Sequence, residues 1–297
     1  MGVNAKVDFY NTEIDKLFLV WKLKDASHDI NHDADGFIRD GIINPSTWFY
    51  SNCRPLFILK EAYNGNGSND SWDLCEWIRS DLEGVSKINT WMTISLWAQG
   101  IIHTDVETLH HLPNEDEQKK TGVSYLDKIA IVNLRKSGGQ KTSNHAVLKE
   151  YVEFDKFELR DEIGFIQPTV IICGGTFRYL SDIFGENLVW VGDDPYINLN
   201  NTNILVLDYY HPACRFPKLM KYYGLVGKYQ KNVVKKRKYA IIKILFINLE
   251  SVFIMHVVKP LLWLLEPYIV YKAYLWGARF MAQPFTWEGE LDWFAFM

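Results

Sequence analysis

Residues 55–67 read Pro55-Leu56-Phe57-Ile58-Leu59-Lys60-Glu61-Ala62-Tyr63-Asn64-Gly65-Asn66-Gly67. The unbroken apolar run at the start of this stretch is typical of a strand that is buried on both faces of a parallel sheet. The run passes through Glu61 into a glycine-rich turn, so the strand ends in a carboxylate. Ligands of open α/β sheets bind outside the carboxyl ends of the strands. The stretch therefore predicts an α/β fold with a functional site beside Glu61.

Three later apolar runs share this form, each leading to polar or glycine residues: 128–134 with Asn133, 169–176 with Gly174, Gly175 and Thr176, and 204–207 followed by His211 and Pro212. Segments with helical spacing separate the runs, which predicts a central, mostly parallel, four-stranded sheet flanked by helices. Parallel strands end at one edge of a sheet, so these polar residues are expected to surround one pocket.

The chain divides by composition into three parts: an N-terminal helical segment at residues 1–48, an α/β domain at 49–230 and an aromatic-rich helical extension at 231–297. Helices are predicted by apolar spacing at residues 9–24, 72–82, 88–100 and 143–164. Ser143 is expected to be the N-cap of the last helix. The segment from Arg135 to Gln140 is expected to be a mobile loop.

Composition is that of a globular protein, with 48% hydrophobic residues among 297. The N-terminus lacks the apolar core of a secretory signal, which favours a cytoplasmic location. The cysteines are widely spaced and include no Cys-x-x-Cys pair: Cys53, Cys75, Cys173 and Cys214. This spacing excludes the common zinc and iron–sulfur motifs, so we expect neither a metal nor a cofactor.

Charge is distributed unevenly along the chain. The formal net charge is −4, but residues 215–238 contain nine basic and no acidic side chains, which leaves 23 basic and 36 acidic side chains elsewhere. A basic segment directly after His211 and Pro212 suits a surface that faces phosphate groups. The alternative is an ordinary solvated basic helix.

The extension contains two apolar runs, residues 239–258 and 260–282. Charged residues and prolines interrupt both of them: Lys243, Glu250, Pro260, Glu266 and Pro267. Each charge at the centre of a membrane helix costs about 2.5–3.5 kcal/mol. We therefore expect a helical appendage, not a membrane span, that is folded on the main domain or buried in a homo-oligomer.

The order of the strand ends resembles the uracil-DNA glycosylase superfamily over roughly residues 50 to 220. Residues 60–64 match the Gly-Glu-Ala-Pro-Gly motif of one branch at Glu61 and Ala62, and Asn133 and His211-Pro212 match later motifs. The chain departs from the family at Lys60 and Tyr63, and it lacks the cysteines that bind an iron–sulfur cluster there. The resemblance implies a monofunctional DNA glycosylase that flips a base and leaves an abasic site.

Breaking an N-glycosidic bond builds positive charge on the sugar and negative charge on the departing base. Glu61 is the expected catalytic group beside the sugar, and His211 is the expected donor to the base. Asn133 offers a donor and an acceptor to a base edge. Four further residues are candidates for contact with the flipped base: Tyr63, Asn64, Asn66 and Trp72.

The DNA backbone requires its own contacts. By analogy with the intercalating loop of the family, Arg215 and Phe216 are expected to enter the duplex. Candidate phosphate contacts come from side-chain charges and from the backbone of a glycine turn: Lys136, Lys218, Gly174, Gly175 and Thr176.

The base itself is less well defined by the sequence. Some bacterial members of the superfamily resemble phage-defence enzymes that act on hypermodified bases, and the polar residues 64–71 suit the hydroxyl groups of glucosylated hydroxymethylcytosine. Uracil excision in base-excision repair is the first alternative. A non-catalytic nucleic-acid-binding or sensor module is the second.

Overall fold

The computed structural model describes residues 2–24, 30–63, 69–139 and 142–253, with side chains up to Lys235. The chain forms two compact units, Met1–Lys235 and Lys236–Met297. Helix α9 (Lys218–Phe253) begins in the first unit, and that unit is described below. Within the described residues, no helix has both the length and the apolar character that crossing a membrane requires.

The first unit is built on a seven-stranded sheet with the order β2-β5-β3-β6-β9-β8-β7. Its strands are β2 (Gly41–Ile42), β3 (Pro55–Tyr63), β5 (Ala130–Gly139), β6 (Val170–Gly174), β7 (Leu188–Val191), β8 (Asp194–Leu199) and β9 (Thr202–Tyr209). Strands β5, β3, β6 and β9 pair in parallel. Strand β2 adds to one edge, and β8 and β7 add to the other, all antiparallel. The expected α/β class is thus confirmed, but the sheet is mixed and has seven strands instead of four.

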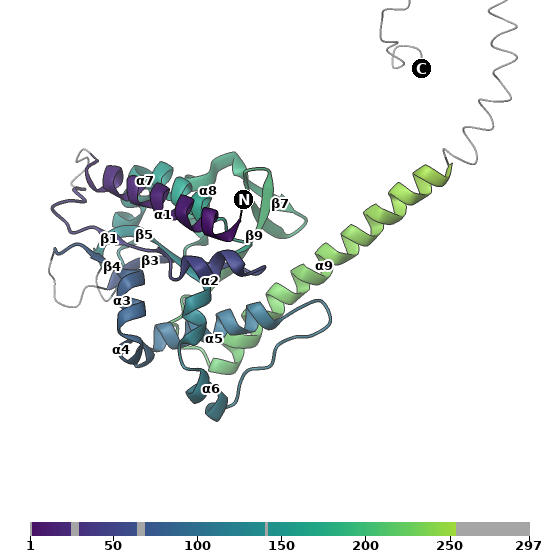
Figure 1. Cartoon of the computed structure of the whole chain (residues 1–297), viewed down its shortest axis with the longest axis horizontal. Coiled ribbons are helices and arrows are strands. Elements are labelled where there is room, and N and C mark those ends of the chain that lie inside the picture. Colours follow the sequence, from purple (N-terminus) through teal and green to yellow (C-terminus); the bar gives the residue numbers. More distant parts are fainter. Residues whose placement is uncertain (1, 25–29, 64–68, 140–141, 254–297) are drawn as a thin grey trace, which may run out of the picture. The chain divides into compact units, whose positions relative to one another are not determined.

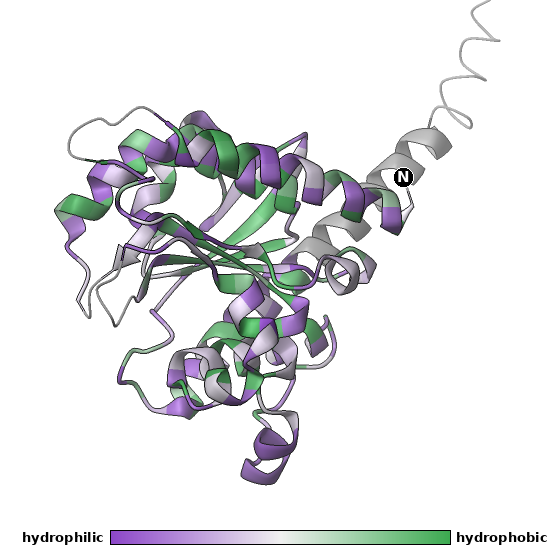
Figure 2. Cartoon of the chain, turned by 60° about the vertical axis from the view of Figure 1, so that its left-hand side comes forward, coloured by the Kyte–Doolittle hydropathy of each residue, from purple (hydrophilic) through white to green (hydrophobic). Residues whose placement is uncertain are grey.

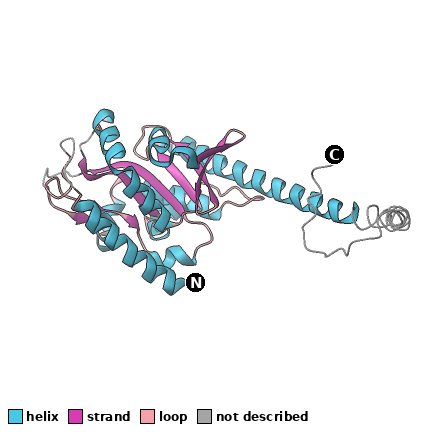
Figure 3. Cartoon of the chain, turned by 90° about the horizontal axis from the view of Figure 1, so that it is seen from above, coloured by secondary structure: helices cyan, strands magenta, loops and turns pink. Residues whose placement is uncertain are grey.

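Helices cover both faces of this sheet (Figures 1 and 3). On one face lie α1 (Val3–Lys22), α2 (Pro45–Tyr50), α7 (His145–Ile166) and α8 (Leu180–Phe184). On the other lie α3 (Leu74–Ser80), α5 (Asn89–His103) and the start of α9. The shorter elements are α4 (Leu82–Ser86), α6 (Glu115–Thr121) and a two-stranded sheet of β1 (Ile38–Arg39) and β4 (Trp72–Asp73).

Alternation along the strands explains this layering. Leu56 and Ile58 of β3 belong to the core under α1 and α7, whereas Phe57 and Leu59 belong to the core under α3 and α5. Successive side chains of a strand point to opposite faces, so a continuous apolar run fills both cores. Figure 2 shows hydrophobic residues concentrated along the strands between the helices.

Some element boundaries differ from those expected. Helix α7 takes its N-cap from Asn144 rather than Ser143. The first two residues of the helix expected at 72–82 form the short strand β4 instead, and Asp73 then caps α3. Residues 135–139 continue β5 and are not a loop. Helix α1 buries four side chains in the core shared with the sheet, so the N-terminal segment belongs to the same compact unit: Tyr10, Ile14, Phe18 and Trp21.

Candidate active site

A cavity of about 570 Å³ opens beside the end of β3 and residue Asn133 of β5. Its lining includes five of the predicted site residues: Glu61, Tyr63, Trp72, Asn133 and His211. They come from β3, β4, β5 and the turn that follows β9. Two other predicted base contacts, Asn64 and Asn66, lie outside the described residues. The structure therefore brings the end of β3, the turn after β9 and Asn133 from within β5 to one cavity, while the chemical role of each residue remains a prediction.

Part of the cavity lining is aromatic and apolar. Trp77 lies between Trp72 and Trp91, with ring centroids 6.2 Å away in each direction. Leu74 and Ile88 complete this part of the lining. Trp77 and Trp91 lie within the helices expected at residues 72–82 and 88–100 and were not among the predicted site residues. The density of tryptophans between residues 72 and 97 was the available signal.

Glu61 is held inside the cavity by residues of β5. Its side chain is only 7% exposed, and its Oε2 lies 3.6 Å from Nη1 of Arg135. Gly139 packs against the same side chain so closely that an added Cβ would lie 2.2 Å from Cγ of Glu61. Both β5 residues were assigned to a loop by the sequence analysis.

Asn133 is fixed by Asp40, which precedes β2. Oδ2 of Asp40 accepts hydrogen bonds from the Asn133 backbone N–H at 2.7 Å and from Nδ2 at 3.0 Å. A carboxylate only accepts, so the amide must turn its nitrogen toward Asp40 and its oxygen away. Asn133 therefore has one amide hydrogen and Oδ1 left for a ligand in the cavity.

Lys136 corrects one of the predicted DNA contacts, because its side chain is fully buried. Its ammonium group pairs with Asp40 and, at 2.7 Å, with Glu162 of α7. Burial alone would lower the pKa of Lys136, but the two carboxylates outweigh it and raise that pKa. Burial also raises the pKa of Glu162 well above its usual range. Lys136 thus supports Asp40 from behind the cavity and has no access to DNA.

His211 is a neutral imidazole in this setting. Burial, followed by the charge of Lys60, lowers its pKa. Its Nδ1 accepts a hydrogen bond from the Ala213 backbone N–H at 3.2 Å, so its proton is on Nε2. Lys221 is also buried and donates to the carbonyl groups of Pro212 and Cys214, which holds this turn in shape.

The turn at Gly174, Gly175 and Thr176 has a structural role that the prediction of phosphate contacts did not include. Gly175 has φ 72°, and its N–H donates to the carbonyl groups of Cys173 and Tyr209. The buried Thr176 hydroxyl donates to the Ile58 carbonyl at 2.8 Å. Gly174 packs on Leu59. These groups bind the ends of three strands together and are not available to phosphates.

The rim near His211 is exposed and carries aromatic and basic residues. Tyr210 and Phe216 are 53% and 47% exposed, with ring centroids 4.8 Å apart. Arg215 is exposed beside them, whereas the Lys218 ammonium donates to Gln118 at 2.7 Å.

A second group of basic residues, Lys60 and Arg178, was not among the predicted DNA contacts and lies by the glycine turn. A Cβ added to Gly175 would lie 3.9 Å from Cε of Lys60 and 3.9 Å from the His211 backbone nitrogen. The pKa of His145 is lowered by desolvation and then by the charges of Lys60 and Arg178. Positive charge therefore surrounds this end of the sheet.

No cluster of three His, Cys, Asp or Glu side chains in the described part of the chain could hold a metal ion. The polar groups of the cavity residues include one carboxylate, one imidazole, one amide and the hydroxyl groups of Tyr63 and Thr90, and they lie beside an aromatic wall. The chain matches no protein-family model and no curated protein.

Proposed function

We propose that this protein is a DNA glycosylase that hydrolyses the N-glycosidic bond of a flipped base. The observation that carries the proposal is the single cavity that Glu61, Asn133 and His211 line together with Trp77 and Trp91. A flat heteroaromatic ring suits such an aromatic wall, and three polar groups are enough to orient it.

Charge of both signs develops during the reaction, and a different residue stabilises each sign. As the bond from C1′ to the base nitrogen breaks, its electron pair leaves with the base and the sugar becomes cationic. Glu61 stabilises that cation and accepts a proton from the water whose oxygen bonds to C1′. The neutral His211 donates its Nε2 proton in a hydrogen bond to the base oxygen, where negative charge collects.

The rim provides a route for the base to leave the duplex. Tyr210 and Phe216 form an exposed aromatic pair that can fill the space of the flipped base. Lys60, Arg178 and Arg215 supply positive charge for the flanking phosphates. Of the DNA contacts expected from the sequence, Arg215 and Phe216 keep that role in the proposal.

For the substrate we propose a cytosine with a bulky C5 substituent, such as glucosylated hydroxymethylcytosine. The support is the size of the cavity, which falls within the range of about 300–1,000 Å³ that holds whole small-molecule ligands. Residues 69–71 do not line it, and the other polar residues of that stretch, 64–68, lie outside the described residues. Uracil is the second candidate, because the amide of Asn133 also complements its imide edge.

The decisive experiment measures base release from defined DNA. Duplexes that contain uracil, unmodified cytosine or glucosylated hydroxymethylcytosine are incubated with the full chain, abasic sites are cleaved with alkali, and the released base is identified by mass spectrometry. Release of the modified base alone supports the proposal in full. Release of uracil alone supports a glycosylase and rejects the bulky substrate. Binding without release of any base would identify a non-catalytic module.

A further inference from the structure

Glu61 is held on two sides by one strand, and the two contacts are of different kinds. Arg135 supplies charge at 3.6 Å, and Gly139 supplies space. A carboxylate that is 7% exposed has lost most of its water, so its position depends on these neighbours. Within the described residues, Arg135 makes the only ion pair of Glu61.

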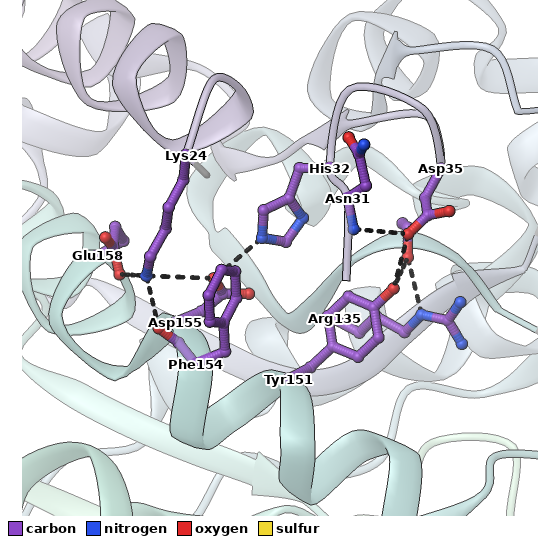
Figure 4. Close-up of polar contacts among 10 residues, drawn as sticks. Lys24, Asn31, His32, Asp35, Arg135, Tyr151, Phe154, Asp155 and Glu158 are labelled. Carbon is purple, nitrogen blue, oxygen red and sulfur yellow. Dashed lines mark hydrogen bonds and ion pairs between the residues drawn. The ribbon is translucent and has the colours of Figure 1, made fainter. Parts of the chain in front are cut away.

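Arg135 is itself fixed in place. Its Nε donates to the Ser137 hydroxyl at 2.8 Å, and its guanidinium lies 4.7 Å from the centre of the Tyr151 ring (Figure 4). Ser137 in turn donates to the Tyr151 hydroxyl at 3.1 Å. A guanidinium that is both hydrogen-bonded and stacked has few remaining rotamers, so its charge is delivered to one point.

The contacts that hold Arg135 in place extend to α7 and to the loop after α1. The Tyr151 hydroxyl donates to Asp35 at 3.3 Å, and the Asn31 backbone N–H donates to the same carboxylate at 3.2 Å (Figure 4). Burial raises the pKa of Tyr151, which keeps its phenol protonated and able to donate. A continuous set of contacts thus runs from the cavity carboxylate to a loop about 100 residues earlier in the chain than Arg135.

We infer that Arg135 is a positioning residue that holds the Glu61 carboxylate in the cavity, and that Ser137 and Tyr151 position Arg135. The inference rests on the proposed function only for its kinetic readout. Arg135 does not line the cavity, so it acts through Glu61 and not on the substrate.

The kinetic test uses single-turnover base release. Arg135→Gln should lower the rate about 10- to 100-fold, because small displacements of a reacting group cost up to about 10²-fold, while the Kd for DNA stays the same. Arg135→Lys keeps the charge and should recover part of the rate. Gly139→Ala should lower the rate similarly by displacing the carboxylate.

The protein that carries Glu61→Gln is the matched control. If Arg135 acts through Glu61, adding Arg135→Gln to Glu61→Gln should cause no further loss of rate. A full additional loss in the double variant would overturn the inference. An unchanged rate for Arg135→Gln alone, in a chain that releases a base, would overturn it as well and would leave the proposed function intact.

A second measurement does not depend on activity. Urea unfolding of the wild type, both single variants and the double variant gives the coupling between the two side chains. We expect Arg135→Gln to destabilise the wild type more than the chain that carries Glu61→Gln. If no substrate releases a base, the proposed function fails, and this coupling alone decides the inference: coupling supports it, and strict additivity overturns it.

Discussion

Asp40 binds Asn133 twice, through the backbone N–H at 2.7 Å and through the amide nitrogen at 3.0 Å. Strand β2 begins at Gly41, which lies opposite Ile131 in the antiparallel register, so β5 has no β2 partner at Asn133 and the Asp40 carboxylate takes the place of a strand carbonyl there. One side chain thus satisfies the backbone of the strand and sets the orientation of the amide in the cavity.

Replacing Asp40 with Asn should destabilise the fold strongly. The change leaves the buried Lys136 with Glu162 as its remaining partner, and breaking a buried ion pair costs about 3–5 kcal/mol. Urea unfolding measures the loss. The control is Asp33→Asn, which removes an exposed pair with Lys22 and should cost less than about 1 kcal/mol. Equal costs for the two variants would show that the buried pair adds nothing.

Replacing Glu61 with Gln tests its chemical role. Glutamine keeps the size of the side chain against Gly139 but removes the anion, so single-turnover base release should fall by about 10²-fold or more. The Kd for DNA should stay within about twofold, because the groups that face the phosphates are unchanged. Glu83→Gln, at an exposed pair with Lys87, is the control and should have the wild-type rate. Wild-type release by the Glu61 variant would remove this residue from the mechanism.

The basic residues by the glycine turn should govern the salt dependence of DNA binding. Changing Lys60 and Arg178 together to Gln should weaken binding to any sequence and reduce the slope of log K against log salt by about 0.9 for each phosphate that the protein no longer neutralises. Fluorescence anisotropy at several salt concentrations gives the slope. Lys119→Gln together with Lys16→Gln removes the same charge from exposed positions on helices α6 and α1 and should leave the slope unchanged. An equal effect of both pairs would mean that only net charge matters.

Acid should destabilise the protein in part through His211. Its folded-state pKa is lowered from 6.5, so as pH falls below about 6.5 the unfolded chain takes up the proton first. Stability is therefore complete above that value and declines until the pH reaches the lowered pKa. His211→Asn should reduce this decline when unfolding free energies are compared between about pH 5 and 7.5. A residual decline is expected from His103 and His110, whose pKa values are also lowered by burial. Parallel curves for the variant and the wild type would contradict the prediction.

Continuous apolar runs were a sufficient signal for the four parallel strands, since strands buried on both faces cannot alternate with polar residues. The hairpin of β7 and β8 was not predicted, because residues 192–195 break its apolar pattern with glycine, two aspartates and proline. Strand β2 has two residues, too few for any periodicity.

A residue that lines the cavity could be predicted where its strand was clear from the sequence, as for Glu61. Lys136 was misplaced because burial of a lysine depends on its partners, and Asp40 lies 96 residues away in sequence. No local pattern encodes that pairing. The same applies to Arg135, whose role depends on a residue in a different strand.

The order of the strands has a further consequence. Strand β3, which carries Glu61, and β9, which leads to His211, each have a hydrogen-bonded neighbour on both sides, whereas the sheet ends at β2 and β7. Local unfolding begins where backbone groups are least protected, which in a sheet is at its outermost strands. This protein can therefore fray at its β7 border while Glu61 and His211 keep their places in the cavity.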